Sequence, residues 1–210
     1  MIYLYSGTPG SGKSLHVARV IKNTLMMNKP VIANIPININ TGRCKHPERF
    51  MYVADEALTP VALVEYSQAY FKDKPVKEGQ ILLIIDEAQR LFNARDWGKS
   101  DRTGWNTFFQ LHRHYGYDII LVAQFDRMLD RQVRSVIEYE QIHRKVSNYG
   151  WRGWLLCAMM VSPVLFVSVK MWYPMKERVG SEFFRYSKRL GRMYDTFMTF
   201  PAVTDKKDAG

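Results

Sequence analysis

The sequence of 210 residues has few cysteines, no basic leader and no uninterrupted apolar stretch as long as an ordinary membrane span. Two cysteines, Cys44 and Cys157, are too few for a disulfide framework, so a reducing compartment is the simpler expectation. The first apolar run ends before Gly7 and has no basic lead-in, which argues against a secretory signal peptide. There is also no internal repeat and no low-complexity tract, so repeat architectures are excluded.

Residues 154–169, a stretch without a charge, are the one candidate for membrane insertion. It has sixteen residues, whereas a spanning helix needs about 20. Ser162 and Pro163 interrupt it and Lys170 closes it, so two buried strands meeting near Ser162 fit better. Membrane insertion stays open as the alternative, because aromatic residues flank the stretch as interface anchors would: Trp151, Trp154, Trp172 and Tyr173.

Acidic residues are scarce: 20 Asp and Glu stand against 30 Lys and Arg, which gives a net charge of +10. Such a surplus suggests an acidic partner, either single-stranded DNA or an anionic membrane surface, unless it only keeps the protein soluble. Basic residues interleaved with aromatics gather in residues 175–192. This segment fits a basic patch for nucleic acid or phospholipid headgroups, and equally a solvated face whose aromatics pack inward.

The N-terminus carries the strongest motif. Residues 2–5 are β-branched, aromatic and aliphatic and predict a buried strand, and a complete G-x-x-x-x-G-K-[ST] loop follows. Apolar residues then recur at helical spacing. Glycines let successive N–H groups point at an anion, and the helix N-terminus adds partial positive charge. The sequence therefore predicts a nucleoside triphosphate site formed by Gly7, Thr8, Pro9, Gly10, Ser11, Gly12, Lys13, Ser14 and Leu15.

Two residues of this loop have individual roles in the expected site. Lys13 can reach the β- and γ-phosphates of ATP, and the Ser14 hydroxyl can ligate Mg²⁺. ATP and Mg²⁺ are therefore the cofactors that the sequence predicts.

A pair of carboxylates is the second strong signal. Residues 81–85 are five consecutive aliphatics, as in a central parallel strand, and they end in Asp86 and Glu87. Ligands of open α/β sheets bind at the carboxyl ends of strands, so Asp86 would hold Mg²⁺ beside the loop, at the tip of a neighbouring central strand. Glu87 would orient and deprotonate the attacking water. The alternative is two solvated acids that merely close a strand.

Two further polar positions are candidate catalytic residues. Gln124 ends the predicted strand 118–123, where its amide can sense the γ-phosphate or the attacking water, although a surface glutamine is the alternative. Arg134 lies on the following helix with Arg127 and Arg131. One of the three, with Arg134 as our choice, would act as an arginine finger on a neighbouring subunit's phosphate, unless all three are solvated.

The remaining pattern predicts an α/β fold: a P-loop NTPase with a mostly parallel central sheet flanked by helices and with added C-terminal strands. We place this domain at residues 1–200 and a flexible tail at 201–210. The five histidines show no metal-ligand spacing. The other expected elements are a strand at 31–37, a connecting excursion at 39–52, a helix at 61–71 capped by Thr59, a helix around 105–115 begun after a loop at 93–103, a helix capped by Asp126, and strands at 138–146 and 154–172.

Together the loop at Gly7, the Asp86–Glu87 pair, the run HRHYGYDIILVAQ at 112–124 and the ending KRLGRMYDT at 188–196 resemble the zonula occludens toxin family. That family is similar to the gene I assembly proteins of filamentous bacteriophages. The resemblance covers nearly the whole chain, and the two longer runs are its specific part. It implies an ATPase at the cytoplasmic face of the bacterial inner membrane that drives assembly and export of virions.

The same resemblance implies a homo-oligomeric ring and contacts with other phage assembly proteins. Family members usually continue into a membrane-spanning helix and a periplasmic region. Residues 201–210 are therefore expected to lead towards an anchor that this chain does not include, the alternative being that this member lacks one. The toxin activity behind the family name belongs to a far C-terminal part and gains no support here.

Three functions stay open on the residues alone. The first is an ATP-hydrolysing motor domain. The second is a small-molecule kinase, which would need an arginine-rich lid and has less use for a strand-end Asp–Glu pair. The third is a nucleotide-dependent scaffold or toxin domain that binds ATP without turnover.

Overall fold

The computed structural model describes residues 1–94, 102–149, 151 and 164–194. Within these residues the strands form one eight-stranded sheet in the order β3-β2-β4-β5-β1-β6-β7-β8. Neighbours from β3 to β6 pair in parallel, whereas β7 and β8 are antiparallel additions at one edge. The strands are β1 (Ile2–Ser6), β2 (Val31–Ala33), β3 (Phe50–Tyr52), β4 (Ile81–Ile85), β5 (Tyr117–Val122), β6 (Tyr139–Lys145), β7 (Leu165–Trp172) and β8 (Glu177–Arg185).

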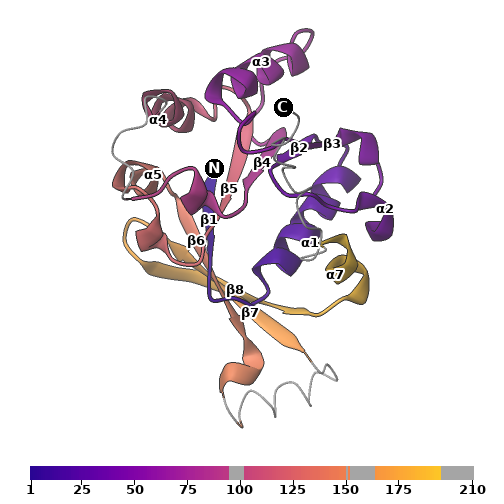
Figure 1. Ribbon diagram of the computed structural model, residues 1–210, viewed down its shortest axis with the longest axis vertical. Coiled ribbons are helices and arrows are strands. Elements are labelled where there is room, and N and C mark those ends of the chain that lie inside the picture. The colour runs from indigo at the N-terminus through magenta and orange to yellow at the C-terminus, as the bar shows by residue number, and fades with distance from the viewer. Residues whose placement is uncertain (95–101, 150, 152–163, 195–210) are drawn as a thin grey trace, which may run out of the picture.

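Helices cover both faces of the parallel part of the sheet (Figure 1). One face carries α1 (Lys13–Met26), α2 (Ile39–Gly42) and α7 (Lys188–Met193). The other carries α3 (Pro60–Tyr70), α4 (Arg102–Leu111) and α5 (Arg131–Ser135). Short 3₁₀ turns connect the elements: η1 (Pro47–Arg49), η2 (Ala88–Arg90), η3 (Asp126–Met128) and η4 (Val146–Tyr149).

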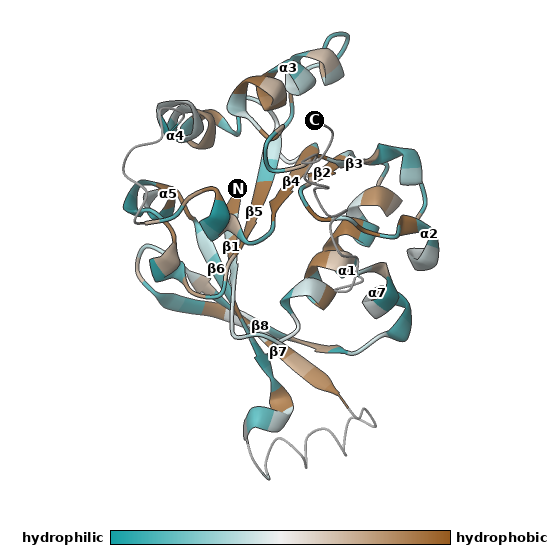
Figure 2. Ribbon diagram, in the orientation of Figure 1, coloured by the Kyte–Doolittle hydropathy of each residue, from teal (hydrophilic) through white to brown (hydrophobic). Residues whose placement is uncertain are grey.

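The core consists of two apolar layers that share the central strands. The central strands are mostly hydrophobic in sequence, as the colours of Figure 2 show. Alternate residues of a strand point to opposite faces. Leu83 therefore packs under α3 and α4, whereas Leu82 and Ile84 pack under α1. All five residues of β4 are buried, as a strand covered on both sides requires. By contrast, β8 is mostly exposed and forms the outer edge of the sheet.

The expected fold class is confirmed, and several elements lie where the sequence predicts them. β4 and β5 match the predicted central strands within one residue. Thr59 caps α3, because its side-chain oxygen accepts a hydrogen bond from the Ala62 N–H at 3.2 Å. β6 occupies the predicted strand at 138–146. β7 occupies the second half of the predicted strand at 154–172, whose first half lies outside the described residues.

Other expectations were wrong. β4 is not next to β1, because β5 lies between them. The strand predicted at 31–37 stops at Ala33. The next residue, Asn34, uses its side chain to hydrogen-bond the backbone of Asp86, just after β4. The excursion at 39–52 contains α2 and the edge strand β3. Asp126 begins only a 3₁₀ turn, and Asp130 caps the short α5 instead.

Some expectations cannot be compared with the structure. Membrane insertion of residues 154–169 and the tail at 201–210 fall wholly or largely outside the described residues. Within the described part, the chain has no helix with the length and apolar character that crossing a bilayer requires.

Candidate nucleotide-binding site

The phosphate loop lies between the end of β1 and the start of α1, at the carboxyl edge of the parallel sheet. Its shape needs glycine at Gly12, whose φ is +94° and whose added Cβ would lie 2.6 Å from the Phe166 ring. At Gly7 an added Cβ would lie 2.5 Å from the carbonyl oxygen of His143. The loop is thus packed directly against β6 and β7, which fixes the position of its backbone.

The start of α1 is suited to an anion. In the described chain no side chain caps α1, and no acidic residue lies in its first turn. The Ser11 hydroxyl is buried and has no hydrogen-bond partner among the described residues. Free N–H groups at a helix N-terminus and an unpaired buried hydroxyl are what a phosphate can satisfy.

Lys13 lies across the loop. Its Nζ donates hydrogen bonds to the carbonyl oxygens of Gly7 at 2.6 Å and Thr8 at 3.2 Å. Burial lowers the pKa of Lys13, while the nearby carboxylates of Glu87 and Asp86 oppose that shift. The three charged groups therefore share one site, as the sequence predicts, although β5 separates their strands.

Asp86 is held by backbone and side-chain contacts from other segments. Its backbone N–H donates to Asn34 Oδ1 at 2.6 Å, and Asn34 Nδ2 donates back to the Asp86 carbonyl at 3.0 Å. Asn34 Nδ2 also donates to Asp55 Oδ1 at 2.7 Å. Asp55 in turn pairs with Arg90 at 3.1 Å. Asn34 therefore ties the ends of β2 and β4 together.

The Asp86 carboxylate accepts a hydrogen bond from the Tyr194 hydroxyl at 2.5 Å. Burial raises the pKa of Asp86, and this hydrogen bond opposes the rise. Burial and the Asp86 carboxylate raise the pKa of Tyr194, while a hydrogen bond with the Ser14 side chain acts in the opposite direction. Tyr194 thus lies between the two side chains that the sequence assigns to Mg²⁺.

Glu87 is exposed at the tip of β4 and has a positive φ of 46°. A non-glycine residue in this region is strained, and such strain often lies at functional positions. The Gln89 side chain donates a hydrogen bond to the Glu87 carboxylate. Glu87 therefore faces solvent close to Lys13, where it can reach a water molecule.

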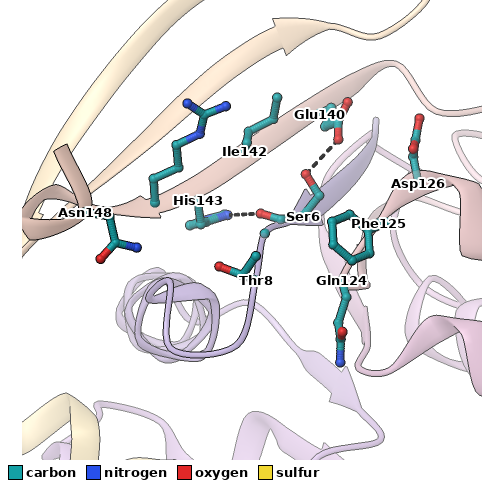
Figure 3. A pocket seen from close by; sticks show the side chains of 11 residues that line it. Ser6, Thr8, Gln124, Phe125, Asp126, Glu140, Ile142, His143 and Asn148 are labelled. Carbon is teal, nitrogen blue, oxygen red and sulfur yellow. Dashed lines mark hydrogen bonds between the residues drawn. The ribbon is translucent and has the colours of Figure 1, made fainter.

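Gln124 joins the loop to β5, since its carbonyl oxygen accepts the Gly7 N–H at 3.1 Å. It lines a cavity of about 430 Å³ beside the loop, between the ends of β1, β5 and β6 (Figure 3). Asp126 and Glu140 line the same cavity. The position of Gln124 is compatible with the predicted sensing role.

Arg134 does not extend freely into solvent. It is half-buried on α5, close enough to Tyr173 to lower the pKa of that hydroxyl, although other causes raise it overall. Its Nε is buried and has no hydrogen-bond partner within the described chain. Arg127 and Arg131 are exposed.

A buried histidine pair lies behind the loop. His16 Nδ1 and His143 Nε2 are 2.8 Å apart, and His143 Nδ1 is 3.2 Å from the Ser6 carbonyl oxygen. If the His143 Nδ1–H donates to Ser6, its Nε2 accepts from the His16 Nδ1–H, and the His143 ring is neutral. Burial lowers the pKa of His16 to about 3 and that of His143 to about 4. The described residues hold no cluster of three or more His, Cys, Asp or Glu side chains fit for a metal.

The sequence profile of the Zonular occludens toxin (Zot) family matches residues 1–178. The chain belongs to this family. Over 140 residues it is 27% identical to the Gene 1 protein of Enterobacteria phage I2-2, an alignment that covers 65% of this chain and 38% of that protein. The Zot-family chain thus spans well under half the length of this curated relative.

Two solved structures share the fold of this Zot-family chain. The N-terminal domain of zonular occludens toxin from Neisseria meningitidis is 21% identical, with a TM-score of 0.57 and coverage of 92% of this chain and 98% of that one. B204, the DNA-packaging ATPase from Sulfolobus Turreted Icosahedral Virus, is 16% identical, with a TM-score of 0.53 and coverage of 89% and 97%. At these identities the likeness establishes the P-loop NTPase fold.

The residues of this Zot-family chain fit a nucleotide with its metal. The loop offers N–H groups and an unpaired hydroxyl, and Ser14 and Asp86 offer the oxygen ligands that Mg²⁺ prefers. Leu15 differs from the rest of the predicted set, because its side chain packs against Phe166 and Phe184. Only its backbone can face a phosphate.

Sequence reasoning missed three residues of the site: Asn34, His143 and Tyr194. Asn34 and Asp86 follow β2 and β4 at the same edge, so a polar residue after a buried strand was an available signal. His143 and Tyr194 come from β6 and the end of α7, far in sequence from the phosphate loop and from Asp86. Tyr194 lies in the run KRLGRMYDT that carries the family resemblance, but only the tertiary fold brings it to the site.

Proposed function

We propose that this chain is the ATP-binding and ATP-hydrolysing motor domain of a protein that assembles and exports filamentous bacteriophage. The observation that carries the proposal is the convergence of Lys13, Asp86 and Glu87 at the loop between β1 and α1. A cation and two carboxylates at a phosphate loop are what hydrolysis of a nucleoside triphosphate needs. The similarity to the Gene 1 protein of Enterobacteria phage I2-2, together with family membership, supports the phage role.

In this proposal the glycine-rich loop and the first turn of α1 present N–H groups to the phosphates. Lys13 leaves the Gly7 and Thr8 carbonyls to contact the β- and γ-phosphates. Ser14 and Asp86 hold Mg²⁺, which neutralises the charge that develops on the phosphates. Glu87 orients and deprotonates the attacking water. Gln124, hydrogen-bonded through its carbonyl to Gly7, detects whether a γ-phosphate is present.

The proposed assembly is a homo-oligomeric ring at the cytoplasmic face of the bacterial inner membrane, with other phage assembly proteins as partners. Arg134 is our choice for the residue that would act on a neighbouring subunit's phosphate. It would first have to leave its half-buried position beside Tyr173. The candidate surface for single-stranded DNA or an anionic membrane is on β8, where Arg178, Phe183 and Arg185 are exposed.

Phosphate release from ATP tests the motor function. We expect turnover by the parent protein and a loss of turnover in Lys13→Ala and Glu87→Gln. The assay is repeated with single-stranded DNA and with anionic liposomes, because either partner of the basic surface would promote the ring and raise the rate per subunit. Parent-like hydrolysis by either variant would refute the mechanism.

The second candidate is a scaffold that binds ATP without hydrolysis. One observation favours it: the Glu87 carboxylate is already engaged by Gln89. In that case ATP would bind with Mg²⁺ and change the oligomeric state, but no phosphate would be released in any of the three conditions. Gln89→Ala distinguishes the two functions, since a hydrolase with Glu87 as its base keeps or increases its rate.

A further inference from the structure

The position of Tyr194 has a consequence beyond the proposed reaction. Its hydroxyl oxygen is 2.5 Å from Asp86 Oδ2, and the same hydroxyl interacts with the Ser14 side chain. These two side chains come from β4 and α1, and Tyr194 comes from the end of α7, which packs beside α1 and α2 (Figure 1). One phenol oxygen therefore bonds one proposed metal ligand, Asp86, and lies close to the other, Ser14.

A metal ion on Asp86 and Ser14 would compete with this phenol oxygen. Mg²⁺ binds oxygen ligands at about 2.0–2.1 Å and demands a near-octahedral shell. An ion held by Ser14 and Asp86, directly or through a water, would therefore need the carboxylate oxygen that Tyr194 now bonds. A phenol is a neutral donor, so the divalent ion is the stronger partner for the carboxylate once a nucleotide supplies its other ligands.

We propose that Tyr194 is a metal-displaced plug: its hydroxyl and Mg²⁺ compete for Ser14 and Asp86, so that loading of the metal–nucleotide complex releases Tyr194. This inference rests on the proposed function, because it takes Ser14 and Asp86 as the metal ligands.

The backbone just before Tyr194 is anchored. Release of the Tyr194 hydroxyl is therefore not expected to move α7. The Met193 carbonyl accepts the Asn38 N–H at 3.0 Å, and the Met193 side chain is fully buried. An added Cβ at Gly42 would lie 2.3 Å from the Met193 sulfur, so the two segments are in close contact. Release of the hydroxyl therefore moves the Tyr194 side chain, while α7 stays in place.

The first test is a Mg²⁺ titration at a fixed concentration of a fluorescent, non-hydrolysable ATP analogue. Tyr194→Phe removes only the hydroxyl, so the half-saturating Mg²⁺ concentration should fall about tenfold, the effect of one hydrogen bond to a charged group. Tyr186→Phe is the matched control, since Tyr186 is exposed on the same segment, and it should titrate like the parent. Binding of the analogue in EDTA should be equal in all three proteins.

The second test observes the parent protein directly and does not depend on the folding of a variant. The protein is labelled with 3-fluorotyrosine, and the Tyr194 resonance is the ¹⁹F signal missing from Tyr194→Phe. Addition of the ATP analogue with Mg²⁺ should shift that signal towards a solvent-exposed value, whereas the analogue in EDTA should leave it unchanged.

The outcomes separate this inference from the proposed function. A half-saturating Mg²⁺ concentration that is unchanged or higher in Tyr194→Phe overturns the plug, as does a ¹⁹F signal that ignores Mg²⁺. Asp86→Asn examines the premise in the same titration. If it weakens Mg²⁺-dependent binding while Tyr194→Phe has no effect, the metal site stands and only the plug fails. If neither the parent nor Asp86→Asn shows any Mg²⁺ dependence, the proposed function itself fails.

Discussion

The two halves of the candidate site are positioned by different means. The loop half, residues 7–14, is fixed by steric contact, because Gly12 and Gly7 pack against Phe166 and the His143 carbonyl. Lys13 also donates hydrogen bonds to carbonyls of the same loop. The acidic half, Asp86 and Glu87, is positioned by side chains from elsewhere, namely Asn34 and Tyr194.

This difference separates rigidity from responsiveness. A loop fixed by steric contact keeps its shape whether or not a ligand is bound, because closely packed atoms cannot be compressed. A carboxylate held by exchangeable hydrogen bonds can change partners at small cost. Damage to the loop half should therefore abolish function or stability outright, whereas damage to the acidic half should alter how the site responds to metal.

The largest expected effect is on the cation of the loop half. Lys13→Ala should lower the rate of phosphate release at saturating ATP by about 10²–10³-fold, the typical cost of removing one group that stabilises developing charge. Lys22→Ala, a change on the same helix away from the loop, is the control and should hydrolyse ATP like the parent. Equal rates for the two variants would show that the loop half does not stabilise the transition state.

The steric basis of the loop half is tested by a pair of glycines. Gly12→Ala should destabilise the fold by about 3 kcal/mol, from a strained φ of +94° and a Cβ 2.6 Å from the Phe166 ring. Gly10→Ala has a similar φ of +73° but no atom within 4 Å, so it isolates the backbone strain and should cost about 1 kcal/mol. The measurement is the free energy of unfolding in urea. Equal losses would mean that packing on Phe166 does not shape the loop.

The loop half was also the part that the sequence could predict. Its motif is contiguous, so residues 7–14 carry the strand, the turn and the helix start in one segment. The continuous apolar run of β4 likewise predicted a central strand and placed Asp86 at its tip.

The unpredicted parts depend on contacts between distant segments. The order β4-β5-β1 follows from tertiary pairing, and the contact of Tyr194 with Asp86 spans 108 residues of sequence. β3 and β8 were missed for another reason. Both are edge strands with exposed faces: β8 lacks the apolar pattern that marks a buried strand, and β3 has only three residues.

The histidine pair behind the loop makes the loop half sensitive to acid. Both pKa values lie below the ordinary 6.5, so the stability they carry is complete above pH 6.5 and is lost as the pH falls towards 4. When the pH falls from 7 to 5, one such histidine lowers the free energy of unfolding by about 2 kcal/mol. The raised pKa of Asp86 acts in the opposite direction, because acid protonates that carboxyl more readily in the fold.

The measurement is the free energy of unfolding at pH 7 and pH 5 in the parent and in His143→Gln, whose amide cannot become charged. In the variant, the free energy of unfolding should differ much less between pH 7 and pH 5 than it does in the parent. An identical pH dependence in both proteins would mean that the pair is charged or solvated.

The smallest expected effect concerns the structural support of the acidic half. Asn34→Ala removes the side chain that bonds the Asp86 backbone and Asp55, and should lower the free energy of unfolding by about 1–2 kcal/mol. Asn23→Ala, an exposed asparagine on α1, is the control and should change stability by less than about 0.5 kcal/mol. Since Asn34 fixes where β4 ends, the variant should also need more Mg²⁺ to bind nucleotide. A loss of stability with an unchanged Mg²⁺ requirement would mean that β4 alone positions Asp86, and the two halves would then be equally rigid.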